Sequence, residues 1–109
     1  MTALVLSLLL AGGAPTAPAP TEVAIASQGY EIAEGQYQAG AQTMEVVLTW
    51  AGRLRDAQRA ANDAQADSKH VARLQALHDQ ASRRYSTGTA TKLDVLAVEV
   101  AQARAARGQ

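Results

Sequence analysis

Two stretches of the sequence decide the expected fold, AEGQYQAGAQTMEVVLTWAGRLRDAQ at residues 33–58 and ASRRYSTGTATKLDVLAVEVAQARAA at residues 81–106. An alanine, a tyrosine and a glycine match between them at a spacing of 48 residues. The matched positions are Ala33, Tyr37 and Gly40 in the first stretch and Ala81, Tyr85 and Gly88 in the second. Similarity at such a period predicts a supersecondary unit that occurs twice.

Each stretch predicts two helices joined by a tight corner. The glycine follows the tyrosine by three residues, and glycine readily adopts the left-handed conformation that ends a helix. A threonine three residues later, Thr43 or Thr91, is a suitable N-cap for the next helix. An acid then falls in the first helical turn, Glu45 or Asp94, where the helix dipole favours negative charge.

The rest of the sequence predicts an all-α protein. Residues 53–87 contain neither glycine nor proline, and no stretch shows the alternation typical of strands. We therefore expect elongated antiparallel helical hairpins that form a coiled-coil-like bundle, with no β-barrel. The expected helices cover residues 22–38, 43–85 and 91–107.

The long central helix has an alternative. Because residues 53–87 lack helix-breaking residues, an unbroken helix from Thr43 to Tyr85 is favoured, and it would place the two corners at opposite ends. If the chain instead turns near Ala66–Ser68, four helices form two hairpins with both corners at one end. Asn62, Asp63 and Asp67 are among the few residues in this region that favour a turn.

Apolar spacing predicts which helix faces are buried. In residues 91–107 the side chains at Leu93, Leu96, Val100 and Ala103 form a seam of coiled-coil type, and two valines form a second apolar face. A similar stripe begins in the central helix, and the indole of Trp50 is expected in a helix interface. The members of that stripe are Val47, Ala51, Leu54, Gln58, Ala61, Gln65, Ser68 and Ala72.

Composition excludes several classes of function. The chain has 109 residues, 10 basic and 10 acidic residues and no cysteine, which argues against nucleic-acid binding and excludes thiol chemistry. No phosphate-binding loop, nucleophile elbow or zinc-protease motif occurs. His70 and His78 would lie about 12 Å apart along a helix, so we expect surface histidines and no metal site. We expect no enzyme, no cofactor and no small-molecule substrate.

The first 20 residues, MTALVLSLLLAGGAPTAPAP, differ from the remainder. A short apolar run is followed by small residues and prolines, which is the order found in a secretory signal peptide. An uncleaved anchor and a disordered N-terminal segment are the alternatives. Residues 21–109 are then the helical region.

The second stretch resembles outer-membrane efflux proteins of the TolC type. Residues 84–97, RYSTGTATKLDVLA, match the pattern Y-x-x-G-x-x-(S/T)-x-x-D-V-L, which that family carries once in each of two structural repeats. Residues 37–46, YQAGAQTMEV, match it more loosely. The resemblance extends over about residues 28–107.

The resemblance implies a role in export. In the family these motifs lie at the periplasmic tips of helical hairpins, where the tunnel formed by three protomers meets a periplasmic adaptor. It implies a chain in the periplasm or at the outer membrane that self-associates or binds an adaptor or a full-length efflux channel. The implied tip contacts are Tyr37, Ala39, Gly40, Ala41, Tyr85, Thr87, Gly88 and Thr89, and the implied acids near the tunnel entrance are Glu45 and Asp94.

The chain also departs from the family. Family members are much longer and have outer-membrane strands between their motifs, whereas here the two glycines are 48 residues apart. In the first stretch the acid, Glu45, lies five residues after the glycine, whereas in the second stretch Asp94 lies six residues after it. Transport by this chain alone is therefore not implied. The alternatives are a structural helical protein of the envelope without an efflux role and a non-functional gene fragment.

Overall fold

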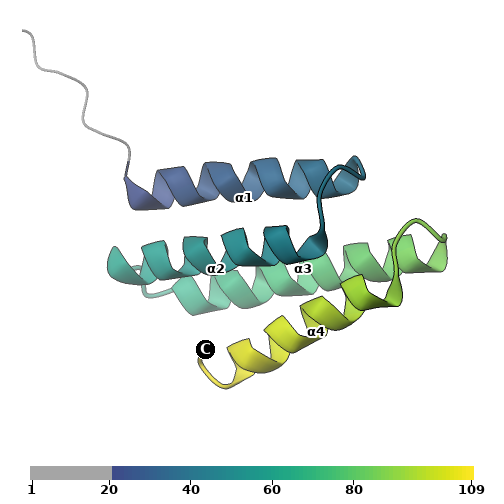
Figure 1. Ribbon diagram of the computed structural model, residues 1–109. Helices are drawn as coiled ribbons and strands as arrows, with labels where there is room; N and C mark the ends of the chain where they lie inside the picture. Colours follow the sequence, from purple (N-terminus) through teal and green to yellow (C-terminus); the bar gives the residue numbers. More distant parts are fainter. Residues whose placement is uncertain (1–20) are drawn as a thin grey trace, which may run out of the picture.

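The computed structural model describes residues 21–109, and this part of the chain forms four helices and no strand (Figure 1). The helices are α1 (Glu22–Gln38), α2 (Met44–Ala60), α3 (Ala66–Ser86) and α4 (Lys92–Ala106). The expected all-α fold is confirmed. The predicted signal peptide at residues 1–20 lies outside the described residues.

Helix α2 is the centre of the arrangement. Helix α1 packs along one side of α2, while α3 and α4 pair with each other and both contact α2 (Figure 1). The α1–α2 contact is close because Gly29 has no side chain: a Cβ atom there would lie 2.3 Å from a ring carbon of Trp50. Trp50 therefore lies in a helix interface, as expected. Its ring leaves no room for a side chain at position 29, which explains the glycine inside α1.

All four helices end in the same way. The residue after each C-cap has a positive φ, and the following N–H groups bond back to the last turn in a Schellman motif. After α1, for example, the N–H of Gly40 donates to the carbonyl of Tyr37 (3.0 Å) and that of Ala41 to Gln36 (2.8 Å). The four residues and their φ values are Gly40 (77°), Asn62 (61°), Gly88 (78°) and Gly108 (80°).

The turn between α2 and α3 corrects the predicted unbroken central helix. Asn62 ends α2 in the left-handed conformation, which asparagine tolerates better than most residues. The carboxylate of Asp63 then accepts the backbone N–H of Gln65 at 2.8 Å and pairs with Lys69 at 2.7 Å. The long central helix is wrong, and the turn lies at residues 61–65, immediately before the alternative position at Ala66–Ser68.

This extra turn brings the two glycine corners together. The α1–α2 corner (residues 39–43) and the α3–α4 corner (residues 87–91) lie at the same end of the molecule (Figure 1). The α2–α3 turn lies at the other end, as do the start of α1 and the end of α4.

The core joins all four helices but contains few large side chains. Six of the fourteen buried hydrophobic residues of the described chain are alanines, and each alanine contributes little apolar area. The stripe predicted along the central helix is confirmed only in α2, where each of its first four residues is at most 9% exposed. Its other members, Ala61, Gln65, Ser68 and Ala72, are exposed, because the turn at residues 61–65 breaks the helix. The main cluster consists of Ala33, Tyr37, Met44, Val47, Leu74, Leu77, Ala81, Val95 and Val98.

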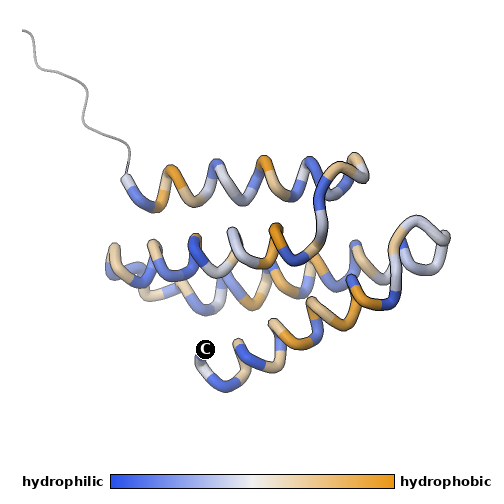
Figure 2. Tube along the Cα trace, in the orientation of Figure 1, coloured by the Kyte–Doolittle hydropathy of each residue, from blue (hydrophilic) through white to orange (hydrophobic). Residues whose placement is uncertain are grey.

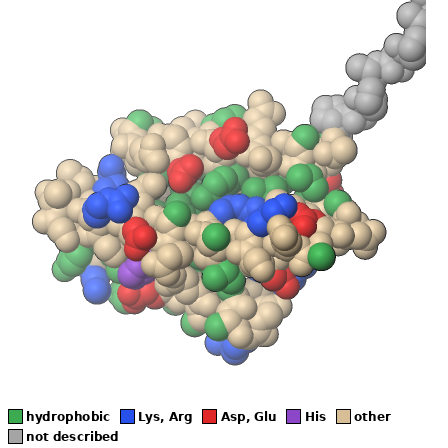
Figure 3. Space-filling model, turned by 180° about the vertical axis from the view of Figure 1, so that it is seen from behind, with side chains coloured by type: hydrophobic (Ala, Val, Ile, Leu, Met, Phe, Trp, Pro, Cys, Tyr) green, Lys and Arg blue, Asp and Glu red, His purple; other side chains and the backbone are tan. Residues whose placement is uncertain are grey.

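A polar contact links α1 to α3. The guanidinium of Arg73 lies 5.9 Å from the ring centroid of Tyr30 and donates to the side-chain oxygen of Gln58 at 2.9 Å. Burial raises the pKa of Tyr30 to about 12. Seen from the side opposite to the view of Figure 1, hydrophobic side chains form a band with basic side chains beside it (Figure 3).

Helix α4 buries only the second of its two predicted apolar faces. Its two valines, Val95 and Val98, are at most 3% exposed, whereas Leu93 is 74%, Leu96 43% and Val100 51% exposed. Helix α4 packs on α2 and α3 through the two valines, and the predicted seam is left largely exposed, with Val100 at the edge of a groove beside α2. The hydrophobic stretch along α4 is visible in Figure 2.

We predict that Asn62→Ala lowers the free energy of unfolding by about 1–2 kcal/mol, because alanine in the left-handed conformation is strained. Asn62→Gly should leave it nearly unchanged. Urea denaturation followed by circular dichroism measures both. If α2 and α3 were one helix, alanine would instead stabilise the protein by about 0.5 kcal/mol, so the sign of the change decides.

Candidate functional site

The first candidate site is the end of the molecule where the two glycine corners meet. Arg84, in the last turn of α3, bridges them: its Nη1 donates to the carbonyl of Gln38 at 3.2 Å and its Nη2 to the carbonyl of Thr89 at 3.3 Å. Its guanidinium also lies 5.0 Å from the ring centroid of Tyr37. One planar side chain with several donors can make all three contacts at once.

A second contact at this end joins α1 to α4. The hydroxyl of Tyr37 donates to Oδ2 of Asp94 at 3.3 Å, and the tyrosine side chain is only 3% exposed. Burial, followed by the nearby Asp94 charge, raises the pKa of Tyr37. Tyr37, Arg84 and Asp94 are together called the corner cluster below. It connects the first hairpin (α1–α2) to the second (α3–α4).

The structure brings most of the sequence-predicted tip residues to one surface. Tyr85 is 48% exposed, with Nζ of Lys92 at 5.6 Å from its ring centroid. Tyr37 differs, since it is buried between the hairpins and contacts the rest of the chain. The exposed corner residues are Ala39, Gly40, Ala41, Thr87, Gly88 and Thr89.

The threonine hydroxyls of the second corner are bonded to the chain itself. Oγ1 of Thr87 donates to the carbonyl of Arg83 at 3.2 Å, and Oγ1 of Thr89 donates to the carbonyl of Arg84 at 3.1 Å. The two hydroxyls also lie 3.1 Å apart. Both hydroxyls therefore bond to carbonyls in the last turn of α3. The exposed surface of the corner consists of small side chains.

The two predicted entrance acids differ in environment. Glu45 is exposed and is the second residue of α2, whereas Asp94 is half-buried, is the third residue of α4 and accepts the Tyr37 bond. The predicted caps also differ. Thr43 accepts the N–H of Val46 at 3.4 Å, but Thr91, although in the N-cap position, makes no such side-chain bond.

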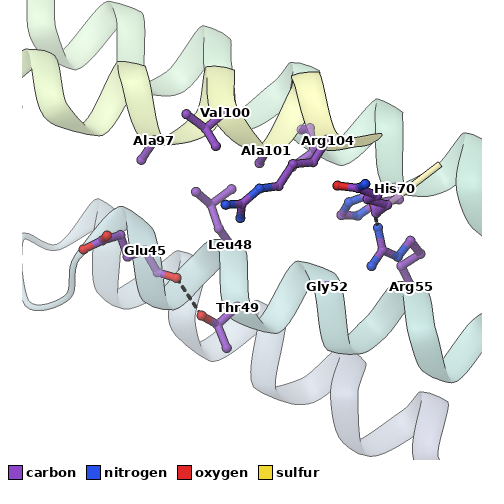
Figure 4. Close-up of a pocket in the computed structure, with 12 residues that line it drawn as sticks. Glu45, Leu48, Thr49, Gly52, Arg55, His70, Ala97, Val100, Ala101 and Arg104 are labelled. Carbon is purple, nitrogen blue, oxygen red and sulfur yellow. Dashed lines mark hydrogen bonds between the residues drawn. The ribbon is translucent and has the colours of Figure 1, made fainter. Parts of the chain in front are cut away.

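A second candidate site, which the sequence analysis missed, is a groove of about 490 Å³ between α2, α3 and α4 (Figure 4). Its apolar lining includes Leu48 of α2, Leu74 of α3 and Val100 of α4. Two arginines, Arg55 and Arg104, line it from facing helices. Only tertiary packing brings these residues together, so their sequence spacing carries no signal.

His70 also lines this groove, and it corrects the prediction of two surface histidines. Its side chain is only 6% exposed, because its position in α3 faces α2. Burial, with the charges of Arg55, Arg73 and Arg59, lowers its pKa to about 4. Its Nδ1 has no hydrogen-bond partner among the described residues. His78 instead pairs with Glu99 at 3.0 Å.

Within residues 21–109, no helix has the length and hydropathy needed to cross a membrane. Neither the protein-family models, the curated proteins nor the solved structures compared with this chain gave a match. The likeness of the corner motifs to TolC-type proteins therefore stays a prediction from the sequence.

We predict that Arg84→Gln lowers the free energy of unfolding by about 1–2 kcal/mol, because it removes two hydrogen bonds and a cation–π contact. Arg84→Lys should recover only part of this loss, since an ammonium lacks the planar fork. The matched control is Arg83→Gln in the same helix turn, with a change within about 0.5 kcal/mol. Equal effects of Arg84→Gln and Arg83→Gln in urea denaturation would contradict a bridging role.

We predict that protein stability falls as the pH drops from about 6.5 to about 4. The pKa of His70 is lowered in the folded state to about 4, so in this window the unfolded chain binds a proton that the folded chain does not. The loss should be on the order of 3 kcal/mol, at about 1.4 kcal/mol per pKa unit.

The control is His70→Leu, in which this loss should disappear. Asp63 and Asp67 have lowered pKa values through hydrogen bonds to Lys69 and Arg59, so their contribution is lost only at still lower pH, in both proteins. Urea denaturation at pH 7, 5.5 and 4.5 measures the difference. Parallel pH profiles for the parent and His70→Leu would show that His70 is not the titrating group.

Proposed function

We propose that this chain is a helical tip module of the TolC type, whose corner end contacts a periplasmic adaptor in transmembrane export. The observation that carries the proposal is that both glycine corners share one backbone construction and lie together at one end. A surface made of two such corners fits a partner that recognises both at once.

The corner surface supports close approach of a partner. Its exposed residues are alanines, glycines and threonines, and small residues allow another backbone to come near. A Cβ atom at Gly40 or Gly88 would meet nothing within 4 Å, so the space beside each corner is open. Tyr85, half-exposed beside the second corner, is of the aromatic type enriched in protein interfaces.

We propose that the two hairpins are copies of one unit. The ends of α1 and α3, the positive-φ glycines and the starts of α2 and α4 each recur at a spacing of 48 residues. The same spacing relates the sequence matches, which supports a duplicated helix–corner–helix unit. Residues 33–58 and 81–106 are its better-matched parts.

We further propose that the module self-associates or packs onto a full-length channel of the exported envelope machinery. Two apolar helix faces support this part of the proposal. Helix α4 exposes Leu93 and Leu96, and helix α1 exposes Ile25 and Ile32. Both faces lie on outer helices, on either side of the central α2, where neighbouring helices would cover them.

The proposal predicts contacts at the corner end only. A photo-crosslinking residue at Ala41 or Thr89 should capture the hairpin domain of a periplasmic adaptor, assayed against a panel of adaptors from the same genome. The matched control is the exposed Ala64 in the α2–α3 turn, at the opposite end, which should capture none.

Glycine substitutions test whether the corner conformation matters. Gly88→Val should abolish adaptor binding while most of the helix content is kept, because valine is strained by about 1–2 kcal/mol at positive φ. Gly88→Asn should retain more binding, since Asn62 adopts this conformation in the same chain. Gly40→Val should weaken binding less than Gly88→Val, because the first motif is the looser match.

Two outcomes would overturn the proposal. Equal crosslinking from Ala64 and Thr89 would mean that the corners are not the contact surface. Unchanged binding in both glycine-to-valine variants would mean that the corners are only connections, as in a structural helical protein of the envelope.

A further inference from the structure

The groove between α2, α3 and α4 has the chemistry of a binding site. We propose that it binds a small carboxylate with an apolar chain, of the class of medium-chain fatty acids. The chain would lie along the apolar walls and the carboxylate at Arg104, whose side chain reaches into the groove. No small-molecule substrate is expected from the sequence, and this site adds a ligand without a reaction. The inference does not depend on the proposed export role.

The size and lining of the groove suit an alkyl chain. Its volume of about 490 Å³ falls within the range of about 300–1,000 Å³ typical of small-molecule sites. Leu48 and Val100 lie on facing helices, and Leu74 lies on α3. Gly52 also lines the groove, and a Cβ atom there would meet nothing within 4 Å, so open space remains in the α2 wall.

The charges at the two ends of the groove differ, which gives a ligand one orientation. Arg55 lies near His70 at one end, Glu45 lies at the other, and the guanidinium of Arg104 lies between them beside Leu48 (Figure 4). Ten residues of helix separate Glu45 from Arg55, a distance of about 15 Å. A carboxylate is attracted to the arginines and repelled by Glu45, so it lies away from the Glu45 end of the groove.

Arg104 is able to accept an anion, and Arg55 adds positive charge at the His70 end of the groove. Arg104 reaches across the groove toward Leu48 of α2, and among residues 21–109 it has no acidic partner within 4.0 Å (Figure 4). Arg55 has a side chain only 14% exposed, and it already has two partners: it pairs at 3.1 Å with Asp56, itself 65% exposed, and its Nη1 donates to the backbone carbonyl of Gln109. A largely buried guanidinium interacts more strongly with a carboxylate than one in water.

His70 provides a sensitive reporter of an anion in the groove. Its pKa is lowered by burial and by the neighbouring arginines, with Asp56 opposing them weakly. A carboxylate bound in the groove would offset part of that positive charge. Ligand binding should therefore raise the pKa of His70, a change that the ordinary apolar contact of a chain would not cause.

The test uses the full chain and decanoate below its micelle concentration. Calorimetry should show saturable binding at one site, and an NMR titration should show a higher pKa for His70 in the complex. Acetate, which lacks the chain, and decyltrimethylammonium, which carries the opposite charge, should each bind at least about tenfold more weakly.

Two variants test the two halves of the site. Arg104→Gln should weaken decanoate binding about tenfold or more, because it removes a charged hydrogen-bond donor. Gly52→Leu should block the groove, and it should fold because the added side chain enters open space in a helix. The matched control Arg83→Gln removes one positive charge outside the groove and should leave binding unchanged.

Several outcomes would overturn the inference. These are no saturable binding of decanoate, equal binding by the parent and both groove variants, or equal binding of the cationic amphiphile. If decanoate fails to bind and Gly52→Leu abolishes an oligomer seen by analytical ultracentrifugation, a second copy covers the groove instead. None of these results changes what is expected from crosslinking at the corners. The ligand-binding proposal and the export proposal can therefore be overturned independently.

Discussion

A residue in the left-handed conformation closes each of the four helices, and the arrangement of the molecule depends on these four closures. They satisfy the last carbonyls of each helix and reverse the chain within five residues at each connection. Three glycines adopt the conformation without strain, while Asn62 does so less easily. Because Asn62 reverses the chain between the two hairpins, the glycine corners meet at one end instead of lying at opposite ends of a rod.

The weak core gives polar contacts a larger share in holding the hairpins together. Alanines bury little area, so the main apolar contribution comes from a few residues such as Met44, Leu74 and Leu77. Between the hairpins, the corner cluster and the Arg73–Tyr30 contact add hydrogen bonds and cation–π contacts at defined places. The outer faces of α1 and α4 stay apolar and exposed.

The sequence predicted what local backbone chemistry determines and missed what depends on neighbours. The first helix, both glycine corners and the start of α4 follow from glycine and threonine positions, and they were correct. Across the turn at Asn62 an unbroken helix was favoured, and the alternative turn was placed a few residues late, because asparagine and aspartate favour turns only weakly. In α4 two apolar faces compete, and sequence periodicity does not say which one meets a partner. Arg84, His70 and Arg104 acquire their surroundings from helices far away in sequence, so no local pattern singled them out.

Because the chain reverses direction three times between its four helices, other polypeptides can be joined to the unit at the end opposite the corners. Thr21 and Gln109 lie at the end opposite the corners, so the described chain leaves and returns on one side. A unit of this kind behaves as an arm fixed at its base, and it can be fused at either terminus or inserted into a host loop without covering its working end. A fluorescent or affinity tag at residue 109 would likewise stand clear of both corners.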